Sequence, residues 1–110
     1  MNKGIDVSEH QGIINWEKVK EQIDFAMIRG SYGLYHIDKT AKRNIEECIR
    51  LKIPFGVYFY SYALNDTQVK TEVITLLEFL KPYKEDISFP VVIDMEDGDG
   101  YKEKKRNAVK

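Results

Sequence analysis

The strongest constraint on the fold is an alternation of short apolar segments with amphipathic segments along the chain. β-Branched and aromatic residues gather in four segments typical of strands, at residues 4–8, 25–30, 55–62 and 90–96. Between them, apolar residues recur at helical spacing over 16–22, from Asp38 or Thr40 to about Leu51, and from just after Asp66 to about Leu80. This βαβαβαβ order predicts one α/β domain whose parallel strands are joined by right-handed crossovers.

The last predicted strand starts at Pro90 and ends in a group of acids. Side chains alternate along a strand, so Val92, Asp94 and Glu96 share one face. Two residues of strand separate the Cα atoms of the two acids by roughly 7 Å. Carboxylates this close raise each other's proton affinity, and α/β barrels place their chemistry at such strand ends. Two interpretations stay open: a catalytic pair of acids, or a solvated loop.

The carboxyl ends of the other predicted strands would lie at the same edge of the sheet. Asp6 ends the first strand, Arg29 the second, and Tyr60 and Tyr62 the third. Acids surrounded by aromatic rings suit a sugar, because carboxylates act on the glycosidic oxygen and C1 while flat rings stack on sugar faces. Plain packing is the alternative, and we favour it for at least one of the tyrosines at 58, 60 and 62. We expect Arg29 to pair with the acids rather than to act as a catalyst.

Few of the remaining polar residues indicate chemistry. His10 is a candidate base or ligand, but the second histidine is distant in the sequence, so we expect no metal site and no cofactor. Cys48 is the single cysteine, which excludes an internal disulfide, and its place in a predicted helix favours core packing over a role as nucleophile. Asp38 and Asn44 are expected to cap a helix and to lie at the surface.

Charge and hydropathy argue against several classes of partner. The net charge is −1, which gives no electrostatic reason to expect nucleic acid or an anionic membrane as partner. The apolar runs are too short for membrane insertion. The N-terminal residues lack the apolar core of a signal peptide, so localisation stays open between action inside the cell, another export route and a trimmed chain.

The N-terminal part of the chain carries the run GIDVS at residues 4–8, followed by QG at 11–12 and INW at 14–16. This succession resembles the opening of the glycoside hydrolase family 25 lysozymes. Residues 25–30 and 53–63 are similar to its second and third strands, and Asp94-Met95-Glu96 matches its Asp-x-Glu motif. The resemblance covers residues 3–101, essentially the whole chain.

The resemblance implies a muramidase that cuts the β-1,4 bond between N-acetylmuramic acid and N-acetylglucosamine in peptidoglycan. By analogy with the family, Glu96 would be the general acid. Asp94 would stabilise the developing positive charge or orient the acetamido group of the substrate, and Asp6 would tune the acids and hold substrate. The expected substrate-binding residues are Tyr60, Tyr62, Arg29 and His10.

Family domains are nearly twice as long as this chain and form an irregular eight-stranded barrel. We therefore expect residues 1–101 to form the front half of a truncated TIM-like (β/α) barrel, and residues 102–110 a polar tail or the start of a fourth helix. Open outer strands predict self-association into a homodimer or a larger assembly. The alternatives are a non-catalytic fragment that at most binds glycan and, more remotely, an unrelated α/β protein whose acid loop binds a cation.

Overall fold

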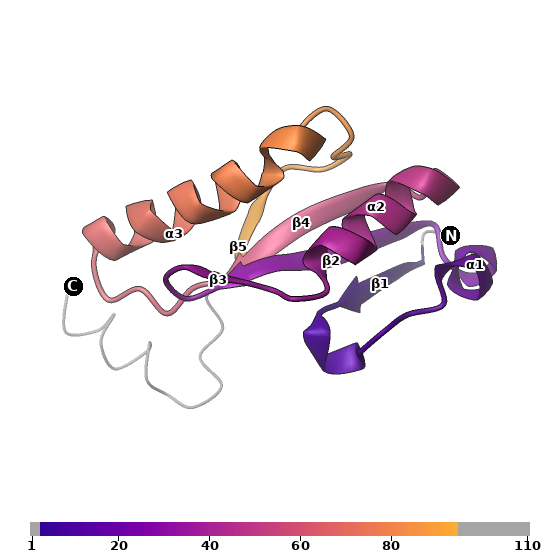
Figure 1. Ribbon diagram of the computed structural model, residues 1–110, viewed down its shortest axis with the longest axis horizontal. Coiled ribbons are helices and arrows are strands. Elements are labelled where there is room, and N and C mark those ends of the chain that lie inside the picture. The colour runs from indigo at the N-terminus through magenta and orange to yellow at the C-terminus, as the bar shows by residue number, and fades with distance from the viewer. Residues whose placement is uncertain (1–2, 95–110) are drawn as a thin grey trace.

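The computed structural model describes residues 3–94, with Asp94 described by its backbone alone. At its centre four parallel strands follow one another in chain order (Figure 1). These strands are β1 (Gly4–Val7), β2 (Phe25–Tyr32), β4 (Phe55–Tyr60) and β5 (Val92–Asp94). All three junctions between them are parallel, which confirms the predicted α/β fold.

The crossovers contain the expected helices together with single 3-10 turns. The elements are η1 (Glu9–Gln11), α1 (Trp16–Val19), η2 (Lys20–Gln22), α2 (Ala41–Leu51), α3 (Asp66–Leu80) and η3 (Lys81–Tyr83). Figure 1 shows α2 and α3 running along the same face of the sheet. The first helix is shorter than the predicted 16–22 because its last turn tightens into η2. Asn15 caps it, accepting a hydrogen bond from the N–H of Lys18.

The hydrophobic core fills the space between the helices and the sheet. Its fully buried members come from alternate strand positions and from the inner helix faces: Val7, Ala26, Ile28, Val57, Phe59, Trp16, Ile45, Cys48, Leu76 and Leu80. Burial raises the pKa of the Cys48 thiol to about 12, so this cysteine is a core residue, as predicted. Leu77 is 52% exposed, because the inner face of α3 follows Leu76 and Leu80.

Residues 33–35 form the turn of a tight hairpin. β2 continues through Tyr32, and the chain returns as β3 (His36–Ile37), which pairs with β2 in antiparallel orientation. Gly33 and Tyr35 have φ values of 60° and 65°, in the left-handed region that glycine adopts readily and tyrosine rarely. This hairpin extends the second strand beyond its predicted end, after a bulge between Arg29 and Ser31.

The last strand begins two residues later than predicted. Pro90 has no N–H for the ladder, and pairing with β4 starts at Val92 opposite Tyr58. The remainder of the predicted strand and the expected tail at residues 102–110 lie outside the described residues. Among the described helices, none combines the length and the apolar character needed to cross a bilayer.

Candidate active site

The candidate site lies where the parallel strands end. β1 carries Asp6 towards that edge, β2 carries Arg29, and β4 carries Tyr60. β5 ends beside β4, because the backbone of Asp94 pairs in register with Tyr60. The sheet thus brings together the ends of the four strands on which the sequence placed its candidate residues. Glu96, the expected general acid, lies outside the described residues.

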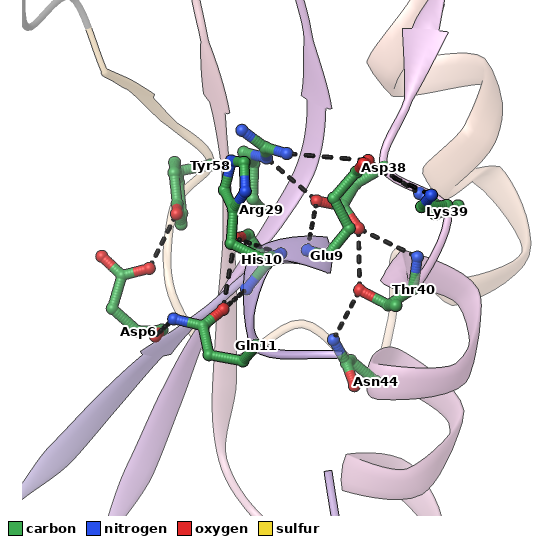
Figure 2. Close-up of polar contacts among 11 residues, drawn as sticks. Asp6, Glu9, His10, Gln11, Arg29, Asp38, Lys39, Thr40, Asn44 and Tyr58 are labelled. Atoms are coloured by element: carbon green, nitrogen blue, oxygen red, sulfur yellow. Dashed lines mark hydrogen bonds and ion pairs between the residues drawn. The ribbon is translucent and has the colours of Figure 1, made fainter. Parts of the chain in front are cut away.

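Asp6 is held by a tyrosine from a strand that is not its neighbour. The hydroxyl of Tyr58 donates a hydrogen bond to Asp6 Oδ1 at 2.7 Å (Figure 2). Val57 and Phe59 are buried in the core, so the alternation along β4 places Tyr58 on the opposite face of the sheet. Its side chain therefore reaches across β2, which lies between β1 and β4. Tyr58 does more than pack, because it orients an acid that stays exposed to solvent.

The turn that follows β1 is fixed by a reciprocal capping box. Ser8 Oγ accepts a hydrogen bond from the N–H of His10 at 3.2 Å, and Gln11 Oε1 accepts one from the N–H of Ser8 at 2.7 Å. His10 is exposed in this turn (Figure 2). This candidate sugar-binding residue thus stands at the carboxyl end of β1, on the same edge as Asp6.

Asp38 is the centre of the polar network, although it was expected at the surface. Its side chain is buried, with 1% relative exposure for the residue. Oδ2 accepts hydrogen bonds from the N–H of Glu9 and from Arg29 Nε, both at 2.9 Å. Oδ1 accepts from the N–H of Thr40 at 2.9 Å and from its hydroxyl at 2.8 Å. One carboxylate therefore joins the turn after β1, strand β2 and the start of α2 (Figure 2).

The protonation of Asp38 reflects two opposing effects. Burial alone acts to raise its pKa, because it removes the charged form from water. The hydrogen bonds from Glu9, Thr40 and Arg29 favour the charged form and outweigh burial, so the pKa lies below its usual value. Asp38 is therefore a structural anion that organises the loops beside the site.

The network continues from Asp38 into the core through Asn44, the second residue expected at the surface. Asn44 is 1% exposed; its Nδ2 donates to Thr40 Oγ1 at 3.3 Å, and its Oδ1 accepts from Trp16 Nε1 at 3.0 Å. A buried indole N–H needs an acceptor, and an amide one helical turn after Thr40 provides it. The lone tryptophan was the signal that could have indicated a buried acceptor nearby.

Among the described residues, Arg29 pairs with Asp38 and Glu9, whereas the side chains of Asp94 and Glu96 lie outside them. Besides Asp38, its described charged partner is Glu9, with 3.7 Å between Arg29 Nη2 and Glu9 Oε1. Its guanidinium carbon lies 4.5 Å from the centroid of the Tyr32 ring. The side chain is only 12% exposed, so most of its surface is committed to these contacts.

Aromatic rings form the β4 side of the site. The Tyr60 and Tyr62 rings tilt against each other, with centroids 4.9 Å apart. Tyr62 follows the end of β4 and is 50% exposed, whereas Tyr60 is less exposed than Tyr62. Two aromatic surfaces therefore stand beside the register position of Asp94. Within the described residues, no group of three or more His, Cys, Asp or Glu side chains is placed to hold a metal ion.

The family of this chain follows from its match to a known family model. Residues 5–110 match the model of the glycosyl hydrolases family 25. The chain belongs to glycosyl hydrolases family 25. This membership confirms the resemblance seen in the motifs at residues 4–8 and 94–96. None of the curated proteins matches the chain.

Solved structures show the same fold. The autolysin LytC of Streptococcus pneumoniae is 39% identical, with a TM-score of 0.80 over 87% of this chain and 23% of its own. A family 25 glycosyl hydrolase of Bacillus anthracis is 27% identical, with a TM-score of 0.71 over 94% of this chain and 46% of its own. The catalytic domain of endolysin ply40 from Listeria phage P40 is 24% identical, with a TM-score of 0.77 over 88% and 48%. This family 25 chain thus spans less than half the length of each.

Proposed function

We propose that this chain acts as a lysozyme-type peptidoglycan hydrolase that cleaves the β-1,4 bond between N-acetylmuramic acid and N-acetylglucosamine. The family match carries the proposal, because residues 5–110 include Asp6, Asp94 and Glu96. The substrate class is supported by LytC, an autolysin whose structure was solved in complex with a synthetic peptidoglycan ligand.

The proposed mechanism uses the three acids in different roles. Glu96 protonates the glycosidic oxygen as its bond to C1 breaks, and positive charge develops on the sugar ring. Asp94 stabilises that charge or orients the acetamido group of the substrate. A water molecule then adds to C1, and its proton returns to Glu96. Asp6, oriented by Tyr58, holds the sugar and tunes the other acids.

Four residues are proposed to bind the glycan strand. Tyr60 and Tyr62 supply ring faces for the apolar sides of sugars. His10 is exposed at the end of β1 and supplies a polar contact. Arg29 has little free surface, so it contributes through the edge of its guanidinium beside Tyr32. The proposed partner is therefore a peptidoglycan glycan strand bound across the strand ends.

Clearing of a suspension of purified cell walls tests the proposal. Glu96→Gln is expected to abolish clearing, because general acid catalysis contributes about 10²–10⁴-fold. Glu85→Gln, at an exposed residue between α3 and β5, is the matched control and should clear walls normally. Borohydride reduction of the products identifies the bond: muramitol confirms a muramidase, whereas glucosaminitol assigns a different cleavage. Near-normal clearing by the Glu96 variant would place the acid elsewhere.

Glycan binding without hydrolysis is the second candidate. The observation that favours it is the share of the matched structures that the chain covers, which lies between 22% and 48% in four of them. Co-sedimentation with insoluble peptidoglycan, combined with the clearing assay, separates the two functions. Retention on the pellet without release of reducing sugars would identify a binding module.

We also propose that the chain self-associates. Of the described strands, β1 and β5 lie at the two edges of the sheet. Large apolar side chains are exposed at and before the β5 edge: Phe89, Val91, Val92 and Ile93. Exposed edges of this kind can pair with another chain. Light scattering that reports the monomer mass of 12.9 kDa at tens of micromolar would contradict self-association.

A further inference from the structure

Glu72, in the middle of α3, is a buried acid that the proposed mechanism does not use. It is only 1% exposed, although glutamate is almost never fully buried without a partner. None of the ion pairs between described side chains includes it. Both of its oxygens instead accept hydrogen bonds from residues that directly follow β4. Oε1 accepts from the Ser61 hydroxyl at 2.5 Å, and Oε2 from the N–H of Tyr62 at 3.0 Å.

These contacts belong to a set that holds the whole loop between β4 and α3. Ser61 Oγ in turn accepts a hydrogen bond from the N–H of Ala63 at 3.2 Å. Gln68 Oε1 accepts one from the N–H of Leu64 at 2.7 Å. Three successive main-chain N–H groups, at residues 62–64, are thus bound by side chains rather than by solvent. Two of the three acceptors, Glu72 and Gln68, belong to α3, so this helix holds the loop.

The residue that this loop presents is Tyr62. Its ring is tilted against Tyr60 on one side. A Cβ added at Gly33 would lie 3.2 Å from Tyr62 Cδ2, so the β2–β3 hairpin also approaches the ring closely. An open cleft of about 440 Å³ lies between the hairpin and the loop, and its lining includes Tyr32, His36, Tyr62 and Glu72. Tyr62 therefore lines this cleft and also contacts Tyr60 at the end of β4.

Packing alone does not account for a carboxylate at position 72. An apolar side chain of similar volume would fill the space without the cost of removing a charge from water. It would, however, leave the N–H of Tyr62 and the hydroxyl of Ser61 without their acceptors. What the carboxylate supplies is two acceptors at fixed positions, and both act on the loop that carries Tyr62.

We infer that Glu72 is a positioning residue that holds the Tyr62 ring in place to bind a sugar unit of the glycan at the β4 end of the site. The inference rests on the proposed function for its ligand class, an acetamido sugar in a β-1,4-linked chain. Glu72 itself contacts the loop and not the sugar, so its effect on binding must pass through Tyr62.

A double-mutant cycle on ligand affinity tests this route. The probe is the tetramer of N-acetylglucosamine, titrated by calorimetry into the whole chain with Glu96→Gln in every sample to prevent turnover. Glu72→Leu and Tyr62→Ala should each weaken affinity about 3- to 10-fold, the loss expected for one aromatic contact. Adding Glu72→Leu to Tyr62→Ala should change nothing further. Additive losses, or unchanged affinity in Glu72→Leu, would overturn the inference.

Conservative and matched variants sharpen the test. Glu72→Gln should bind the tetramer with an affinity within about twofold of the parent, which is the chain carrying Glu96→Gln alone. The amide oxygen can accept from the N–H of Tyr62 while the amide N–H donates to the Ser61 hydroxyl. Glu78→Leu, on an exposed position of the same helix, should leave affinity unchanged. If Glu72→Leu does not fold, Ser61→Ala removes one contact with little change in volume. It should weaken binding only when Tyr62 is present, and a loss that persists in Tyr62→Ala would contradict the inference.

The outcomes separate this inference from the proposed hydrolysis. Binding with the expected cycle but no wall clearing by the unsubstituted chain would support the positioning role and reject the hydrolase. Wall clearing together with additive losses in the double-mutant cycle would support the hydrolase and reject the positioning role. If the parent fails to bind the tetramer, a β-1,4-linked acetamido sugar is not its ligand, and the positioning role is overturned.

Discussion

Two buried carboxylates, Asp38 and Glu72, hold the loops on opposite sides of the strand ends, and they do so differently. Asp38 sits beside the guanidinium of Arg29 and receives four hydrogen bonds from three segments. Glu72 receives two, and both come from neutral donors of one loop. On the side of Asp38, the loops are held by a charged carboxylate. On the side of Glu72, the loop is held by two hydrogen-bond acceptors.

Replacing each carboxylate by its amide tests this difference, because the two acids face different hydrogen-bond donors. Both oxygens of Asp38 face at least one N–H, so the amide nitrogen of an asparagine would necessarily meet another donor. Oε1 of Glu72 faces only a hydroxyl, which can reverse its role and accept. A carboxylate is therefore required at position 38 but replaceable by an amide at position 72.

The largest expected effect is the contrast in stability between Asp38→Asn and Glu72→Gln. Asp38→Asn should lower the free energy of unfolding by about 3–5 kcal/mol, because it breaks the buried ion pair with Arg29 and places an amide N–H against another N–H donor. Glu72→Gln should lower it by no more than about 1 kcal/mol. Urea titration followed by circular dichroism measures both, with Asp86→Asn at an exposed position as the control. Equal losses in the two variants would show that the two acids act alike.

A smaller effect is expected from pH, and it concerns Asp38. The folded-state pKa of this carboxyl lies below its unfolded value of 3.8. Its ionisation therefore stabilises the folded state fully above that value, and the stabilisation is lost as the pH falls through the folded-state pKa. The stability difference between the unsubstituted chain and Asp38→Asn should accordingly shrink between about pH 5 and pH 2. A difference that stays constant over this range would mean that charge is not what Asp38 contributes.

The fold was accessible from the sequence because its signals are local. Strand segments rich in β-branched and aromatic residues, separated by helical periods, predicted the order and the parallel pairing of the four main strands. The hairpin at residues 32–37 was missed because its turn uses Tyr35 at positive φ, a conformation that its residue type does not announce. Helical spacing gives α3 a broad apolar stripe that includes Leu77, and only the packing of the helix selects which part of that stripe is buried.

The supporting networks were less accessible because their partners are distant in sequence. Asp38 and Asn44 look like ordinary capping residues, and their burial depends on a turn near Glu9 and on Trp16, some 30 residues earlier. Asp6 was identified by its place at a strand end, but its contact with Tyr58 spans 52 residues and crosses a strand. Spacing along one strand can identify an acid, but it does not reveal the residue that orients it.

The smallest expected change in stability belongs to the contact between Tyr58 and Asp6, and comparison with a second tyrosine isolates its role. Tyr58 donates to Asp6 Oδ1 at 2.7 Å, and Tyr83 donates to Glu46 Oε2 at 2.8 Å, in contacts that are both exposed. Phenylalanine at either position removes one hydroxyl, and each variant should lose less stability than Glu72→Gln, because water replaces the lost partner of an exposed acceptor. Only Tyr58→Phe should slow wall clearing, because only Tyr58 orients an acid at the strand ends. Equal clearing by the two variants would show that Asp6 needs no such support, or that it takes no part in the reaction.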